Sequence, residues 1–549
     1  MSEQPNFINQ SERVIDFCVQ KANDTERPLL LIGGDMSGIQ PFLYHIVSSK
    51  AAKNLRGRSC YIDLLGRAVV QALLGALGLT RDHIVCETGG TFVLIASNSE
   101  DVVKALDGAI AFVERRMFET HGTELSIAID SVPITVAEAK GGTDTLAQRW
   151  NELFAKREAK KNAKFARLLS DDSAYSRFFT PQAVNGDRRD AITCEDIVGK
   201  VCHADDVGDV TEINEAIFKL GEKLREGKKP IMIYDQCPAR PDDEFTICPA
   251  GLGITFALRN LDNSKPDKIF EKLLENNEDS LQRLGILRMD VDSLGAKFQQ
   301  CAREQSLAAY AKLSYELGNF FSGKVKELCD EKGCQLLYGG GDDLFVVGQW
   351  NKTIELAEEI NSKFKEWAKG REGEWSLSAG IAIVKAKYPI IEGAQESGDE
   401  EDNAKCHHCG GVTKQSISFM GMPMNWEKEF TAVKVLKEKL VEMVDNGRLP
   451  KAFLQNVMRH VLNGEFVDHC PTNVSIYWHL AYDIKRAAER APKEHREQVA
   501  ELLRNLQTES YSNSKTLVGT PVTTSYHLLE LWALAARWAE LQCRTNNNQ

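Results

Sequence analysis

The sequence predicts an α+β protein in which two ferredoxin-like domains precede an all-α C-terminal domain. Residues 281–425 read as strand, helix, hairpin, helix and alternating strand, which is the β-α-β-β-α-β order of the split βαβ arrangement. The same order recurs in residues 29–187 and indicates an internal repeat. From Trp426 onward, apolar residues recur at helical spacing.

These patterns divide the 549 residues into five parts. We expect an N-terminal leader (1–28), a first domain ending in a basic helix (29–187), a cysteine-containing inter-domain region (188–280), a second domain (281–425) and a helical domain (426–549). The hydrophobic content of 43% and charged content of 27% are ordinary for a globular protein. The net charge of −12 does not indicate a general nucleic-acid binder, so any such contact must come from local basic stretches.

Neither an apolar run long enough to span a bilayer nor a signal peptide stands out. Fourteen cysteines are scattered without a dense framework, which fits a reducing compartment better than a disulfide scaffold. We therefore expect a cytoplasmic protein without a membrane partner.

The most informative stretch is Gly339-Gly340-Gly341-Asp342-Asp343, flanked on both sides by apolar runs. It predicts a β-hairpin with two acids at its tip, because glycine tolerates the positive φ of tight turns and lets a phosphate approach the backbone. Adjacent carboxylates repel each other, and a bound divalent cation would offset that repulsion. A solvated Gly-Asp turn is the alternative.

The surroundings favour the cation. An apolar strand runs into Asp290-Val291-Asp292, an amphipathic helix separates it from the hairpin, and a helix over 353–369 and a strand over 377–383 follow. If the first strand lies beside the hairpin, Asp290 comes close to Asp342 and Asp343, which makes a two-metal phosphoryl-transfer site plausible. This layout resembles the palm domain of nucleotide cyclases and polymerases.

In the first copy, a strand ends in Asp35 and Ser37, and helices over 59–77 and 101–118 enclose a hairpin over 84–96. Superposing the two patterns places Ser37 on Asp292, and Thr91 and Phe92 on Asp342 and Asp343. We therefore expect the first copy to have lost its metal site. Two copies facing each other could still share a cleft and join two nucleotides.

Two basic segments, residues 48–59 and 149–167, could contact phosphate or RNA, or could simply be solvated helix surface. The C-terminal pattern predicts helices over 433–444, 453–462, 474–487, 497–506 and 526–542. We expect these helices to form a protein-docking domain.

Two groups of cysteines raise the question of zinc. Cys194, Cys202, Cys237 and Cys248 have irregular spacing, which is weak evidence for a metal site. Cys406 and Cys409 have the spacing of half a zinc knuckle and stand in a polar, acidic segment interpreted as a loop. They could bind zinc or be unpaired thiols in a flexible insertion.

Several ordered motifs together resemble the large polymerase subunit of type III CRISPR effector complexes, Csm-type more than Cmr-type. They are Gly34-Asp35-Met36-Ser37-Gly38, Leu55-Arg56-Gly57-Arg58-Ser59, Asp290-Val291-Asp292-Ser293, Gly340-Gly341-Asp342-Asp343, Lys387-Tyr388-Pro389-Ile390 and Ser416-Ile417-Ser418-Phe419-Met420-Gly421.

This resemblance implies a target-RNA-activated nucleotidyltransferase that converts ATP into cyclic oligoadenylates. Asp290, Asp342 and Asp343 would hold two Mg²⁺ or Mn²⁺ ions, and Ser37, Ser293, Gly340 and Gly341 would contact nucleotide. The implied partners are guide RNA (crRNA), target RNA, the small subunit and the subunit that binds the 5′ end of the guide.

The chain also departs from the family. Many members begin with an HD-type nuclease domain, whereas this sequence has only about 28 residues before its first strand and no His-Asp dipeptide, so we expect no DNase activity. The family's four-cysteine ribbon between the palms is also in doubt. The rival readings are a diguanylate-cyclase-like enzyme, synthesis of another AMP conjugate, and a non-catalytic scaffold of the complex.

Overall fold

The computed structural model describes most of the chain outside the inter-domain region. The described residues are 7–24, 26–44, 51–88, 90–141, 145–170, 178, 273–274, 281–298, 306–339, 343–371, 373–462, 466–467, 469–473, 475–511 and 515–544. Cys194, Cys202, Cys237 and Cys248 lie outside them, as do Gly340, Gly341 and Asp342. Within this part of the chain, none of the helices combines the length and the apolar character needed to cross a membrane.

The described residues divide into two compact units. The first falls within Met1–Ile269, Ser293–Glu327 and Leu337–Leu344, and the second within Phe270–Asp292, Leu328–Leu336 and Phe345–Gln549.

A four-stranded sheet with the order β2-β3-β1-β4 forms the centre of the first unit. Strand β1 is antiparallel to both β3 and β4, and its register places Asp35 opposite Thr91. The strands are β1 (Leu29–Ser37), β2 (Ile84–Thr88), β3 (Thr91–Ser97) and β4 (Ser126–Ile134).

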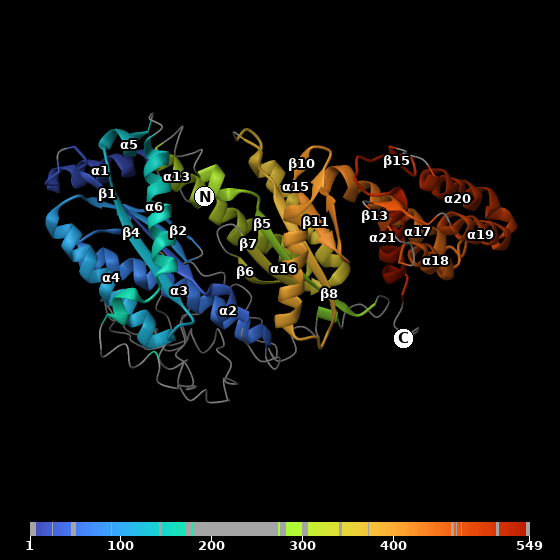
Figure 1. Ribbon diagram of the computed structural model, residues 1–549, viewed down its shortest axis with the longest axis horizontal. Helices are drawn as coiled ribbons and strands as arrows, with labels where there is room; N and C mark the ends of the chain where they lie inside the picture. The colour runs from blue at the N-terminus through green and yellow to red at the C-terminus, as the bar shows by residue number, and fades with distance from the viewer. Residues whose placement is uncertain are drawn as a thin grey trace, which may run out of the picture. The chain divides into compact units, whose positions relative to one another are not determined.

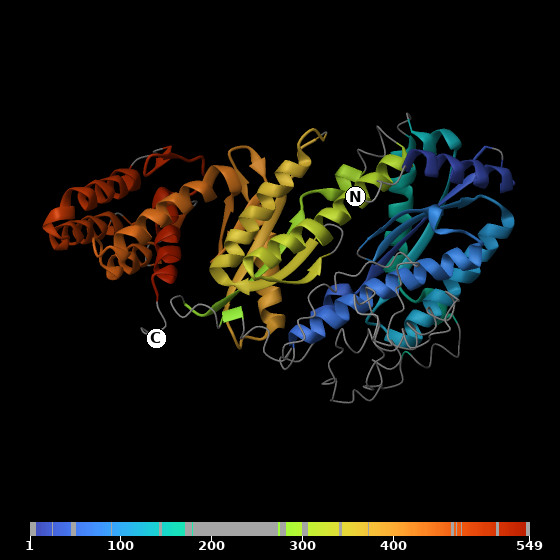
Figure 2. The same ribbon diagram turned by 180° about the vertical axis from the view of Figure 1, so that it is seen from behind.

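Helices cover both faces of this sheet, because alternate residues of β1 enter different cores. Leu30 and Ile32 pack with α3 (Ala51–Leu77) and α4 (Glu100–His121). Leu29 and Leu31 pack with residues of α1 (Phe7–Lys21), α6 (Thr145–Asn162) and α13 (Leu307–Asn319). Figure 1 and the reverse view in Figure 2 show these helices on either side of the sheet. The short helices α2 (Ile39–Tyr44), α5 (Val136–Lys140) and α7 (Ala166–Leu169) complete the domain.

Two helices of this unit depart from the expected boundaries. The segment expected to be a polar leader contains α1, whose Val14, Ile15 and Cys18 are buried against the sheet. Helix α13 follows β5 in the chain, yet its Leu307 and Tyr310 belong to the same core as α1. Sequence order therefore does not mark the domain boundary at this helix.

The second sheet repeats the first and extends it. Its order is β6-β7-β5-β8-β11-β12, and the first four strands correspond one by one to β2-β3-β1-β4. The strands are β5 (Arg283–Val291), β6 (Gln335–Gly339), β7 (Asp343–Gln349), β8 (Leu377–Lys385), β11 (Ser416–Phe419) and β12 (Met422–Asn425). The matching order confirms the predicted pair of palm-type domains.

Helices α15 (Trp350–Ala368) and α16 (Ile390–Cys406) lie on opposite faces of β5. Gly285 approaches Trp350 and Thr353 of α15, whereas Ile286 contacts Gly393 of α16. Arg288 and Asp290, two and four residues after Ile286, also meet α16. The period of two along β5 therefore directs Asp290 toward this helix.

Helix α16 corrects the interpretation of its acidic part as a loop. It packs closely, because a Cβ built on Gly380 of β8 would lie 2.1 Å from the backbone nitrogen of Glu401. Its buried face consists largely of small and polar residues, namely Ile390, Gly393, Ala394, Ser397, Glu401 and Ala404. No wide apolar stripe marks such a helix in the sequence.

The predicted C-terminal helices are present within the second unit, where α17, α18 and α20 pack against α21 and α19 packs against α18 and α20 (Figure 1). They are α17 (Thr431–Asp445), α18 (Lys451–Leu462), α19 (Ser475–Arg490), α20 (Arg496–Tyr511) and α21 (Leu528–Gln542). Trp538 of α21 packs edge-on against Phe419 of β11, with ring centroids 5.1 Å apart. This contact links the helices to the extended edge of the second sheet.

Candidate active site

Asp290 stands one residue before the end of β5 and faces Ser378 of β8 in the register. Its Oδ2 lies 2.7 Å from Nζ of Lys405 on α16. The same ammonium lies 2.6 Å from Oε1 of Glu401, whose other oxygen lies 3.3 Å from Nε of Arg288. Asp290 is thus held by a cation within a four-residue charge network.

Lys405 is the cationic centre of this network. Burial alone would lower the pKa of Lys405, but the charges of Asp290 and Glu401 and the hydrogen bonds to both hold it above its ordinary value. The ammonium therefore stays charged throughout the physiological pH range, and it occupies a position beside Asp290 that another cation could take.

Asp292, the second acid of the Asp-x-Asp motif, has a different role. Its residue is only 5% exposed. Its Oδ1 accepts a hydrogen bond from Ser378 Oγ, and its Oδ2 accepts bonds from Ser376 Oγ and the backbone N–H of Gln415, over distances of 2.7, 2.7 and 3.1 Å. Both oxygens are used within the fold, so Asp292 ties β5, β8 and the segment before β11 together.

Ser293, predicted to contact nucleotide, is exposed and has a φ of 56°. A non-glycine residue with positive φ is uncommon and marks a tight local turn. Its carbonyl accepts hydrogen bonds from the backbone N–H groups of Ala296 and Lys297. Its contact with nucleotide stays a prediction.

Asp343 is the first residue of β7, and the three residues before it are outside the described part of the chain. Strand β7 is the neighbour of β5 in the sheet order. The roles of Asp342, Gly340 and Gly341 therefore remain predictions from the sequence.

The first palm repeats the aspartate–lysine pair but lacks the two adjacent acids of the hairpin. Asp35 Oδ2 lies 2.5 Å from Lys161 Nζ on α6. Its Oδ1 accepts a hydrogen bond of 3.3 Å from Thr91 Oγ1, the residue that the sequence comparison aligns with Asp342. Burial opposes the charge of Lys161, but its hydrogen bonds to Asp35 and Glu158 leave its pKa raised.

The hairpin of the first palm is also closed by an aromatic ring. Phe92, which the sequence comparison aligns with Asp343, is 2% exposed and pairs with Gly34 in the register. A Cβ added to Gly34 would lie 2.2 Å from the Phe92 ring, so the ring covers this part of β1. Ser37 ends β1 half-buried and opposite Ser126; its proposed nucleotide contact is untested.

Sequence reasoning missed Lys405 and treated Lys161 only as part of a basic segment. In each copy the lysine lies on the helix that packs over the first strand and follows the last palm strand. The one available signal was the Glu401–Lys405 spacing, which suits an i,i+4 ion pair on a helix. That signal needed α16 to be recognised as a helix first.

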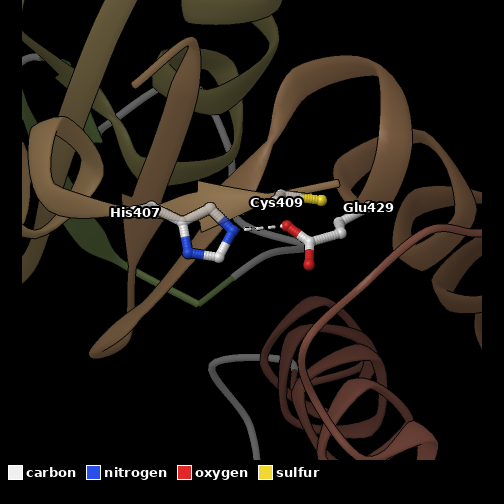
Figure 3. A group of neighbouring side chains, drawn as sticks. All are labelled: His407, Cys409 and Glu429. Carbon is white, nitrogen blue, oxygen red and sulfur yellow. Dashed lines mark hydrogen bonds and ion pairs between the residues drawn. The ribbon is translucent and has the colours of Figure 1, made fainter. Parts of the chain in front are cut away.

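The predicted Cys406 and Cys409 half-site is rearranged. Cys406 is exposed, whereas Cys409 is buried. Cys409 lies instead with His407 and Glu429, and one ligand atom from each residue falls within 4.8 Å of the others. Figure 3 shows the His407 ring directed at the Glu429 carboxylate, with Cys409 beside them.

Comparison with known proteins identifies both palms. A family model described as Csm1 subunit domain B matches residues 28–179, and one described as the second palm domain of Cas10/Cmr2 matches residues 283–413. The chain is 26% identical over 488 residues to the protein of Enterococcus italicus named CRISPR system single-strand-specific deoxyribonuclease Cas10/Csm1 (subtype III-A), covering 81% of this chain and 61% of that one. The protein of the same name from Mycobacterium tuberculosis is 26% identical, over 76% of this chain and 57% of its own length.

Solved structures agree on the fold. The apo Csm1–Csm4 cassette matches with a TM-score of 0.59 and 20% identity, covering 95% of this chain and 70% of that one. The Csm1–Csm4 cassette in complex with cA4 matches with a TM-score of 0.57 and 20% identity, over 98% and 72%. The chain spans about three fifths of the length of the curated relatives above. With its duplicated palms and the two matching domain models, the chain belongs to the Cas10/Csm1 family of type III CRISPR systems.

Proposed function

We propose that this chain is the nucleotidyltransferase subunit of a type III CRISPR effector complex. When target RNA pairs with the guide RNA, the second palm converts ATP into cyclic oligoadenylates by forming 3′–5′ phosphodiester bonds. One observation carries the proposal: in the palm whose hairpin bears the acids, a partly exposed aspartate stands one residue before the end of the central strand and already binds a cationic group.

The donors fit a hard divalent cation, since carboxylate oxygens are the protein ligands that Mg²⁺ and Mn²⁺ prefer. Asp290, with Asp342 and Asp343 from the hairpin, would hold two such ions. When bound, the ions would lower the pKa of an attacking 3′-hydroxyl and neutralise charge on the triphosphate.

The residues of the chain have separate tasks in this proposal. Lys405 orients the Asp290 carboxylate, and Asp292 fixes the end of β5 through its three hydrogen bonds. Gly340 and Gly341 would leave room for phosphate at the hairpin, and Ser293 would contact the adenosine. The first palm, with Ser37 at the end of its strand, would hold the second nucleotide.

The partners follow from the family. Its solved relatives include Csm1–Csm4 cassettes, and we expect this chain to bind the corresponding subunit, the small subunit, guide RNA and target RNA.

The deciding experiment incubates the assembled complex with labelled ATP, Mg²⁺ and target RNA and identifies the products by mass spectrometry. We expect cyclic oligoadenylates from the parent, and none from the double variant Asp342→Ala/Asp343→Ala in an intact complex. Asp402→Asn, which changes an exposed acid on α16, is the matched control and should keep full activity.

The other outcomes separate the rival readings. An AMP conjugate of another metabolite would replace the proposed product. An intact complex that consumes no ATP would indicate a scaffold, and continued synthesis by the double variant would refute the assignment of the acids.

A further inference from the structure

A buried group of three metal-ligating side chains lies apart from the palm acids, within the second unit. His407 directly follows α16, and Cys409 belongs to β9 (His408–Cys409). Strand β9 pairs with β10 (Val412–Thr413) across a turn in which Gly410 and Gly411 have φ values of 54° and 80°. Glu429 comes from the π-helical segment η5 (Trp426–Phe430).

We propose that His407, Cys409 and Glu429 form a structural zinc site that fastens the second palm to the C-terminal helices. An imidazole nitrogen, a thiolate sulfur and a carboxylate oxygen are the three ligand types that zinc takes in proteins. All three residues are buried, with exposures of 8%, 1% and 0% in chain order. A buried cluster with this mixture of ligands is unusual unless its charges are compensated.

The three ligand atoms are close enough together to bind one zinc ion after small movements of the side chains. Zinc ligands at bond lengths near 2.0–2.3 Å stand about 3.2–3.6 Å apart in a tetrahedral site. The three ligand atoms here lie within 4.8 Å of one another. His407 Nε2 and Glu429 Oε2 are 2.6 Å apart, so zinc would replace the proton that this nitrogen and oxygen share, and would widen the pair.

The charges of the neighbouring side chains also favour a cation at this site. Glu429 is completely buried, and the neighbouring cation, Lys428, directs its Nζ to the carbonyl oxygens of Cys409 and Gly410 at 3.2 and 2.9 Å. A divalent ion among these side chains would compensate the carboxylate and stabilise the thiolate.

The surrounding residues hold the ligands in place, as outer-shell partners do in zinc sites. The carboxylate of Glu429 accepts hydrogen bonds from the backbone N–H of Asn425 at 2.8 Å and from Thr524 Oγ1 at 2.5 Å. The His407 ring stacks on Tyr526, with centroids 5.6 Å apart and an interplanar angle of 12°. These contacts prepare the ligand geometry without supplying a compensating charge.

The cluster also contacts the segment that precedes α21, which is distant from Cys409 in the sequence. Thr524 and Tyr526 immediately precede α21, and Cys409 Sγ lies 2.9 Å from the carbonyl oxygen of Thr523. This carbonyl or a water molecule would provide the fourth ligand. Because the site is closed to substrate, its role would be to stabilise the junction rather than to catalyse a reaction.

Zinc content of the full chain, purified without chelator, tests the proposal. We expect Glu429→Gln to bind about one zinc equivalent fewer than the parent, because it removes the anionic ligand while keeping the size of the side chain and one acceptor oxygen for Asn425 or Thr524. Cys406→Ser, three residues from Cys409 and exposed, is the matched control and should keep the parent stoichiometry.

A cobalt titration keeps the test decisive if other cysteines also bind zinc or if a variant folds poorly. Co²⁺ added to chelator-treated parent should give a thiolate-to-cobalt absorption band that persists in Cys406→Ser and weakens in Cys409→Ser and Glu429→Gln. Equal zinc content in the parent and Glu429→Gln, or a band unaffected by Cys409→Ser, would show that the group is only a hydrogen-bonded cluster.

Discussion

Lys405 pairs with Asp290, the carboxylate that we propose as a metal ligand, and this pairing gives a measurable prediction. The ammonium lies 2.7 Å from Asp290 Oδ2, and the side chains are 28% and 24% exposed. A hydrogen bond between charged groups contributes about 1.5–3 kcal/mol, and about 1.4 kcal/mol corresponds to a tenfold change in affinity. Because Lys405→Met releases the carboxylate, Mn²⁺ should bind roughly 10- to 100-fold more tightly.

Calorimetric titration of the full chain with Mn²⁺, in the absence of nucleotide, measures this change. Lys161→Met is the matched control, because Lys161 makes the same contact with Asp35 in the palm where Thr91 replaces an acid. The control should leave Mn²⁺ affinity unchanged, and adding Asp290→Asn to Lys405→Met should remove the gain. Unaltered affinity in Lys405→Met, or an equal gain in the control, would refute the reasoning.

Three further predictions concern the fold and its acids. Asp292→Ala should lower the free energy of unfolding by about 2–4 kcal/mol in urea titrations, because it leaves buried donors unpaired. Asp290→Ala should instead leave the chain folded and abolish nucleotide synthesis. The reverse pattern would contradict the roles assigned to the two acids. Gly380→Ala should cost about 1–3 kcal/mol by overpacking against the backbone of α16, whereas Gly318→Ala, with open space around its Cβ position, should not destabilise. Burial raises the pKa of the Cys18 thiol to about 12 in the folded protein, whereas its unfolded value is near 9. The contribution of Cys18 to the free energy of unfolding is therefore complete below pH 9 and is lost as the pH rises toward 12. Cys18→Ala should lose less unfolding free energy than the parent between about pH 9 and 10.5, and parallel plots of unfolding free energy against pH would refute this.

The sequence was most informative where burial follows a simple period. Strands such as β1 and β5 alternate between two cores, and the hairpins carry their glycine signals, so the order of elements in both palms was predictable. The shared order of the two sheets then followed from the repeat. These features depend on local pattern, which a single sequence contains.

The parts that failed depend on tertiary contacts. Helix α16 buries glycine, alanine, serine and glutamate residues because it packs by its backbone on Gly380. The partner of His407 is Glu429, 22 residues away, and no spacing rule for neighbouring cysteines could find it. The Lys405 contact with Asp290 was hidden for the same reason.

The Phe92 ring over Gly34 has a consequence for attempts to revive the first palm. Replacing Thr91 and Phe92 with acidic residues would change the core as well as the surface. Loss of a buried phenylalanine costs about 3–5 kcal/mol of folding free energy, and burial of the new carboxylate would add a desolvation cost. Building a metal site in the first palm would therefore require redesign of the core around Gly34 and Phe92 as well as the new acids.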